Sequence, residues 1–227
     1  MNTRNLIRWA GLAAVVAGIM YVIVGLFHPP NILSSVTTSR WAIVHYVVLA
    51  VSFFGLLGMA GLYARQVKEA GWLGLAGYLL FSLWLFLVAG FTFFEVFILP
   101  LLATEAPRFA EGFLGIFTGS ASETSLGALP AAWMLLGPMY ILGGLLFGIA
   151  TFRARILPRW AATVFGVGAP LSLAFGLLPH ERQPLAAVPV GVGLAWLGYA
   201  LWSERRQTAA EPVPGRASPQ RRTTAAQ

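Results

Sequence analysis

The sequence of 227 residues contains no cysteine, and none of its eight acidic residues is aspartate. The absence of cysteine excludes a disulfide framework, a thiolate metal site and a cysteine nucleophile. Charged residues are also scarce: they make up 10% of the chain, against about 25% in a typical soluble domain. With 58% hydrophobic residues, this composition excludes an ordinary soluble enzyme, a disordered chain and a nucleic-acid-binding module, and it indicates a polytopic membrane protein.

Six stretches are long and apolar enough to cross a bilayer as helices, which takes about 20 residues. In chain order they are Ala10–Phe27, Trp41–Tyr63, Trp72–Leu99, Ala131–Phe152, Ala161–Leu178 and Leu185–Trp202. They are continuously apolar, without the alternation of a membrane barrel. The sequence therefore predicts an all-α, polytopic transmembrane helix bundle of six spans within residues 1–206. The first stretch is longer than a signal-peptide core, so we expect it to be retained.

The basic residues fall mainly on one side of these spans. That side carries twelve Lys and Arg residues, and the other carries Arg40, Arg108 and Arg182. Because Lys and Arg concentrate in cytoplasmic connections, both termini are predicted to be cytoplasmic. Arginine is far more frequent than lysine, and alanine, glycine and leucine are abundant. This composition is typical of a GC-rich bacterial genome. The predicted location is therefore the bacterial inner membrane, with the lipid bilayer as the main partner and no nucleic acid.

Two segments lie outside the predicted spans. In the outer connection over residues 100–130, apolar side chains at helical spacing predict an amphipathic helix over Pro107–Thr118 on the membrane surface. A hydrophobic loop folded over the mouth of the bundle is the alternative. Residues 207–227 have almost no large apolar side chains, so we expect a disordered cytoplasmic tail.

Glycine and proline recur inside the spans. Glycines at helical spacing, such as Gly144 and Gly148, allow close helix packing within the bundle or against other membrane helices in a homo-oligomer. In a further alternative the protein is a helper subunit of a membrane complex and binds partner helices through these glycine faces. Pro138, Pro170 and Pro189 interrupt the last three spans and predict kinks there. Discontinuous helices line the binding sites of many transporters.

Glu95 is the only charged side chain well inside a predicted span. His45 lies at a similar depth in the preceding span, where Arg40 and Tyr46 are close in sequence, and His28 ends the first span. All of them fall toward the outer side. An ionisable side chain within the membrane indicates a functional site. We therefore predict a polar pocket open to the outside that contains these residues and binds or transports a small ligand or ion.

Two other interpretations stay open for the same residues. His28, His45 and Glu95 could bind a metal ion, since two histidines and one carboxylate are a known ligand set, and the protein would then be a membrane-embedded metal-dependent hydrolase. Alternatively, Glu95 pairs with His45 or Arg40 only to hold two helices together. The sequence contains no nucleophile elbow, phosphate-binding loop, dinucleotide fingerprint or haem-attachment motif, so it identifies no cofactor and no catalytic residue.

Several short motifs are shared with known proteins. They are the basic start over Arg4–Trp9, the Phe-His-Pro-Pro run over 27–30, the segment Arg40–His45, the Gly-Leu-Tyr-Ala-Arg run over 61–65 and the closing run over Leu197–Trp202. On these the chain resembles a family of small bacterial six-helix integral membrane proteins, over about Arg4–Arg206. The resemblance implies the six-helix architecture. No activity is assigned to that family, so it implies no chemistry.

Overall fold

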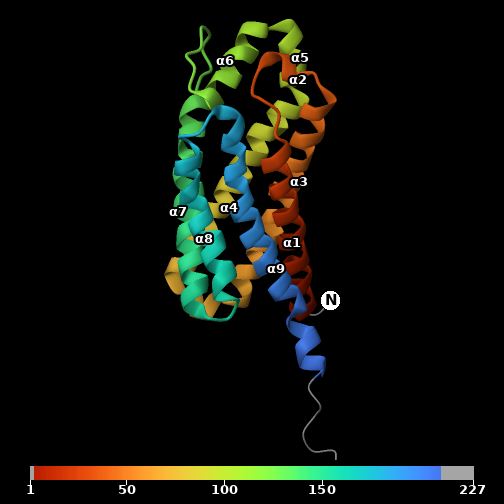
Figure 1. The fold of residues 1–227 in the computed structure, drawn as a ribbon, viewed down its shortest axis with the longest axis vertical. Helices are drawn as coiled ribbons and strands as arrows, with labels where there is room; N and C mark the ends of the chain where they lie inside the picture. Colours follow the sequence, from red (N-terminus) through yellow and green to blue (C-terminus); the bar gives the residue numbers. More distant parts are fainter. Residues whose placement is uncertain (1–2, 211–227) are drawn as a thin grey trace, which may run out of the picture.

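The computed structural model describes residues 3–210, which form an elongated helical bundle (Figure 1). The helices of these residues are α1 (Thr3–Phe27), α2 (Leu33–Val36), α3 (Ser39–Arg65), α4 (Val67–Phe97), α5 (Leu99–Glu105), α6 (Pro107–Thr118), α7 (Leu129–Ala154), α8 (Arg159–Phe175), the 3-10 helix η1 (His180–Ala186) and α9 (Ala187–Ala210). There is no strand in this part of the chain, so the all-α prediction is confirmed.

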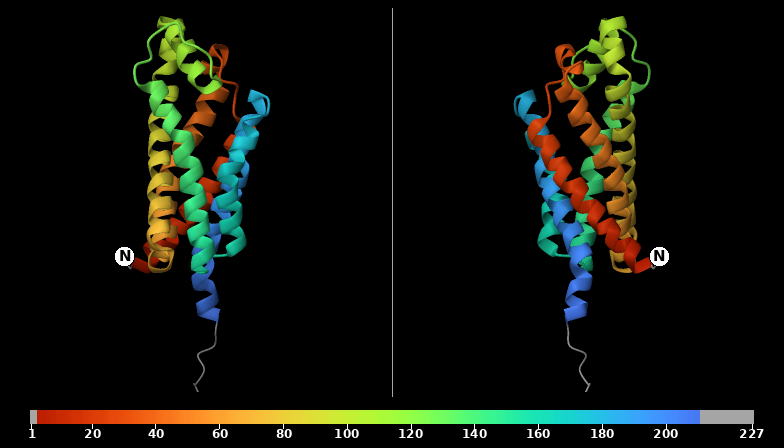
Figure 2. Two further views of the ribbon diagram at one scale, coloured as in Figure 1. Left: turned by 90° about the vertical axis from the view of Figure 1, so that its left-hand side faces the viewer. Right: turned by 90° about the vertical axis from the view of Figure 1, so that its right-hand side faces the viewer.

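The six long helices α1, α3, α4, α7, α8 and α9 form a closed ring in chain order. Each packs against the next, and α9 returns to pack against α1. Successive long helices run in opposite directions, so the N-terminus lies at the lower end in Figure 1 and α2, α5 and α6 lie at the upper end. The helices are drawn together at the lower end and spread apart toward the upper end (Figure 2).

Each of the six predicted apolar stretches corresponds to one long helix. Five helical segments are long and apolar enough to cross a membrane: the helices within 5–27, 39–65, 67–97 and 129–154, and the segment over 180–204. The sixth long helix, α8, has 17 residues. Large apolar side chains such as Phe53, Phe86 and Trp160 are exposed on the outside of the ring, which is compatible with a multi-pass membrane protein whose outer surface faces lipid.

Close backbone contact between helices adds to the buried side-chain core of the ring. A Cβ atom on Gly148 of α7 would overlap Gly166 of α8, and one on Gly191 of α9 would lie 2.7 Å from the carbonyl oxygen of Gly18 on α1. Such close approach is available only to glycine. The prediction that the glycines Gly144 and Gly148 serve packing within the bundle is confirmed.

The outer connection closes part of the upper end. The α4 helix ends at Phe97, and after a turn at Ile98 the chain continues as α5 and α6. The helix α6 has the bounds predicted for an amphipathic helix. Its apolar side chains pack on the bundle: Phe113 is fully buried, with its ring 4.6 Å from that of Phe94 and 6.2 Å from that of Phe91.

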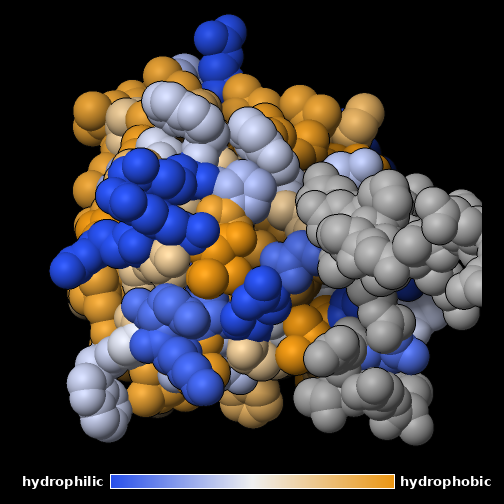
Figure 3. All heavy atoms as spheres, turned by 90° about the horizontal axis from the view of Figure 1, so that it is seen from below, coloured by the Kyte–Doolittle hydropathy of each residue, from blue (hydrophilic) through white to orange (hydrophobic). Residues whose placement is uncertain are grey.

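The lower end carries much of the charge. Figure 3, which looks onto this end, shows hydrophilic side chains gathered there, and Lys68, Arg153, Arg155 and Arg159 are exposed. The α9 helix continues to Ala210. Residues 207–210, predicted to be disordered, are therefore helical, in keeping with the high helix propensity of their two alanines. The rest of the predicted tail lies outside the described residues.

Candidate functional site

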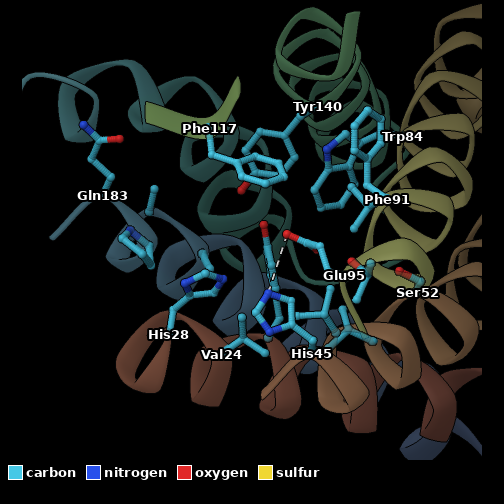
Figure 4. A pocket seen from close by; sticks show the side chains of 18 of the residues that line it. Val24, His28, His45, Ser52, Trp84, Phe91, Glu95, Phe117, Tyr140 and Gln183 are labelled. Carbon is cyan, nitrogen blue, oxygen red and sulfur yellow. Dashed lines mark ion pairs between the residues drawn. The ribbon is translucent and has the colours of Figure 1, made fainter. Parts of the chain in front are cut away.

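A cavity of about 350 Å³ opens within the upper half of the ring. Residues from α1, α3, α4, α6, α7, α8, η1 and α9 line it, so it lies on the axis of the bundle and not between one pair of helices. Its volume is in the range of small-molecule sites. Figure 4 shows Glu95 pointing from α4 into this cavity toward His45 of α3.

Glu95 and His45 form a buried pair across the α3–α4 contact. The Nε2 atom of His45 lies 3.7 Å from the Oε1 atom of Glu95, and the two side chains are 1% and 9% exposed. This distance is too long for a direct hydrogen bond. No other hydrogen bond or ion pair reaches the Glu95 carboxylate among residues 3–210, so one of its faces is open to the cavity.

Trp41 fixes the position of both members of the pair. Its indole Nε1 donates a hydrogen bond of 3.0 Å to the backbone carbonyl of Glu95, and its own backbone carbonyl accepts one of 2.8 Å from Nδ1 of His45. The Trp41 and His45 rings also stack, with centroids 4.0 Å apart. A carbonyl can only accept, so Nδ1 of His45 carries the hydrogen and Nε2 faces Glu95.

Two further histidines lie at the cavity. The ring of His28 is edge-on to that of His45, with centroids 5.2 Å apart, and its Nδ1 donates to the Pro29 carbonyl at 2.7 Å. Burial, together with the nearby His45, lowers the pKa of His28 from its ordinary 6.5 to about 4. His28 is therefore neutral at neutral pH. His180, on η1, also lines the cavity.

Unpartnered polar atoms are concentrated in the cavity. Among the lining residues, three buried side-chain atoms have no hydrogen-bond partner: Asn31 Oδ1, His45 Nε2 and Ser52 Oγ. The hydroxyl of Tyr140 is paired with that of Tyr21. A buried polar atom without a partner costs about 1–3 kcal/mol. Three such atoms among the lining residues favour a polar molecule as the occupant of this space, because hydrogen bonds to it would satisfy them.

Aromatic side chains form much of the cavity lining. Phe91, Phe117 and Trp133 line it, as do Trp84 and Tyr140, whose ring centroids are 4.6 Å apart. Figure 4 shows Phe91, Phe117, Trp84 and Tyr140 across the cavity from His28 and His45. The ring of Phe81 packs against both of the rings of Trp84 and Tyr140, with its centroid 5.0 Å from that of Trp84 and 5.9 Å from that of Tyr140. The ring of Phe165 lies 5.1 Å from that of Phe81. These rings are tilted against one another and lie between the cavity and the lower half of the ring of helices.

The structure brings together three of the five residues predicted for the pocket: Glu95, His45 and His28 all line the cavity. Tyr46 and Arg40 do not. Tyr46 is 50% exposed and packs edge-on against Phe97 on the outside of the bundle, because it follows His45 directly and so faces away from it. Arg40 is exposed, and its Nε donates to the Phe27 carbonyl at 3.2 Å.

The metal-site interpretation gains no support from the geometry. His28, His45 and Glu95 do not form a group that could hold a metal ion, and neither does any other set of three such side chains in the described part of the chain. Nδ1 is engaged with a backbone carbonyl in both His28 and His45.

Several lining residues were not predicted from the sequence. Trp41 and Trp133 stand near the ends of apolar stretches. In the structure Trp41 is fully buried and Trp133 lines the cavity. Ser52 lies seven residues after His45, on the same face of α3. That spacing of two helical turns was the available signal for Ser52.

The chain matches no protein-family model, no curated protein and no solved structure. The functional argument therefore depends on the cavity alone.

Proposed function

We propose that this chain is a six-span protein of a bacterial inner membrane that binds a small polar ligand in the cavity around Glu95 and His45, from the side opposite the cytoplasm. The observation that carries the proposal is a cavity that holds a buried carboxylate, Glu95, and three lining residues with unpartnered buried polar atoms. In a purely structural pair, the polar atoms would be satisfied by each other or by the backbone.

Six spans are favoured by the closed ring. The α8 helix packs between α7 and α9, both of which are apolar and long enough to span. Its 17 residues fall at the short end of the range for transmembrane helices. An even number of spans would place both termini on one side. The exposed Lys68, Arg153, Arg155 and Arg159 at the lower end favour the cytoplasm for that side.

The cavity therefore opens to the exterior. We take this arrangement as an outward-open state, with the aromatic rings between the cavity and the cytoplasmic half. Pro138 lies inside α7 and Pro170 inside α8, which are continuous neighbouring helices, and helices can bend about such prolines. Bending of α7 and α8 is the motion by which a bound ligand would be moved past the aromatic rings.

A cysteine scan tests the binding site directly, because the chain has no cysteine of its own. Val88 of α4 lines the cavity two turns below Glu95, and Thr151 is fully buried near the lower end of α7. In the full-length protein, Val88→Cys should react with a small neutral thiol reagent and Thr151→Cys should not.

Ligand binding is tested on the same variant. Compounds that raise the unfolding temperature of the wild-type protein should protect Val88→Cys from the reagent, and Glu95→Gln should abolish this protection. Glu105→Gln, an exposed glutamate on α5 outside the cavity, is the matched control. An unreactive Val88→Cys, or protection that does not depend on Glu95, contradicts the proposal.

A further inference from the structure

The charge of the cavity depends on one residue. Its titratable lining residues are Tyr21, His28, His45, Glu95, Tyr140 and His180, and no Lys or Arg lines it. The chain as a whole has a formal net charge of +7, so the cavity differs in charge from the rest of the molecule. Glu95 is thus the one carboxylate in a lining that contains neither Lys nor Arg.

The lining around this carboxylate is aromatic. Tyr21, Trp84 and Tyr140 lie deep in the cavity, and Phe91, Phe117 and Trp133 lie beside its wall. The negative faces of aromatic rings attract cations, and rings grouped around a carboxylate are the usual arrangement for recognising an organic ammonium group. An inorganic ion would instead require several oxygen ligands, and Glu95 is the only carboxylate present.

The space between His45 and Glu95 is also a position where a proton can be held. Nδ1 of His45 is already a donor to the Trp41 carbonyl, so a neutral His45 presents the lone pair of Nε2 to the Glu95 carboxylate, 3.7 Å away. Two facing lone pairs repel each other, and one added proton converts them into an attractive pair. A cation bound at the open face of Glu95 would remove the need for this proton.

From these features we propose that the ligand is a small organic cation of the ammonium class, and that its binding at Glu95 competes with one proton held between Glu95 and His45. The inference rests on the proposed function, because it names the chemistry of the ligand of that site. The proton leaves through the open upper end of the cavity, so the net charge of the site is unchanged by the exchange.

The other charged and titratable groups near the pair do not replace Glu95. The other titratable residues of the lining are Tyr21 and the neutral His28 on the α1 side, Tyr140 on α7 and His180 on η1. Arg40 lies outside the lining, hydrogen-bonded to Phe27. Acidification could charge His180 as well, so His180→Gln is included as a control for the pH dependence.

The test compares two thiol reagents of similar size and opposite charge. Trimethylammonium-ethyl methanethiosulfonate is itself an organic cation, and sulfonatoethyl methanethiosulfonate is an anion; either must pass Glu95 to reach Val88→Cys in the full-length protein. The ratio of the two rates is divided by the same ratio at Ser125→Cys, an exposed position on the outer connection. We expect a corrected preference for the cation of about tenfold or more, as for one unit charge in a partly buried site.

Three further results are expected. Glu95→Gln should bring the corrected ratio to about one, whereas Glu105→Gln should leave it unchanged. Lowering the pH should decrease the ratio in the parent and in His180→Gln, but not in Glu95→Gln. Tetramethylammonium should protect Val88→Cys from a neutral reagent at concentrations at which sodium does not.

Each failure has a distinct meaning. If neither charged reagent nor the neutral one reacts at Val88→Cys, the proposed function is wrong. If all three react without a preference for the cation, or if the preference survives in Glu95→Gln, the cation inference is wrong and the binding site stands. Equal protection by sodium and tetramethylammonium, or protection by neither, overturns the assignment to organic cations. A corrected ratio of cationic to anionic labelling rates that does not depend on pH overturns the competition with a proton.

Discussion

The α7–α8 contact offers the sharpest stability test of the bundle. At Gly148 a methyl group would overlap the Cα atom of Gly166 and lie 2.9 Å from its nitrogen and 3.0 Å from the Ala162 carbonyl oxygen. All three are main-chain atoms, so no side chain can rotate to make room. Gly148→Ala must therefore push α8 away from α7. Gly90 of α4 is the matched control, because nothing lies within 4 Å of a Cβ atom added there.

The expected difference follows from two effects. Replacing a helical glycine by alanine stabilises a helix by about 0.5–1 kcal/mol, and this gain is common to both variants. Overpacking costs about 1–3 kcal/mol and applies to Gly148→Ala alone. Gly148→Ala should thus be less stable than Gly90→Ala by about 1–3 kcal/mol, measured by denaturant unfolding of the detergent-solubilised protein. Equal stability of the two variants would mean that α7 and α8 do not approach each other as described.

Three other predictions concern buried polar groups. The pKa of His28 is lowered to about 4 in the folded protein, so the unfolded chain gains a proton first as the pH falls. The free energy of unfolding should therefore be highest above about pH 6.5 and decrease toward pH 4. The decrease should be weaker in His28→Gln. Thr151→Val removes the acceptor of the 2.8 Å bond from Gln66 Nε2 and should cost about 1–3 kcal/mol in denaturant unfolding; no loss would show that Gln66 finds another partner. Trp41→Phe keeps a ring but loses the donor to the Glu95 carbonyl, so it should weaken the cation preference at Val88→Cys more than it lowers the unfolding temperature.

The helices could be predicted from the sequence because hydrophobic length is a local property. All six apolar stretches correspond to long helices, and the helix over Pro107–Thr118 was found from the spacing of its phenylalanines. The break between α4 and α5 was not found: the predicted third span continues to Leu99, whereas α4 ends at Phe97, before Pro100. Apolarity alone does not reveal where a helix changes direction.

The pocket could be predicted only in part, because its position depends on which face each helix turns inward. Glu95 and His45 were found because ionisable side chains are rare in apolar helices. Tyr46 was included on sequence proximity, and the helical rotation of one residue carries it to the outside. Trp84 and Tyr140 gave no signal, since an aromatic residue in an apolar helix looks the same whether it faces lipid or a cavity.

The central claim is that the cavity opens on the face opposite the Arg-rich end. It is tested most directly by the labelling rate of Val88→Cys with the membrane-impermeant cationic reagent, in membrane vesicles of the two orientations. We expect rapid labelling when the periplasmic face is outward and little labelling when the cytoplasmic face is outward. Faster labelling from the cytoplasmic face, or none from either face, would contradict the account.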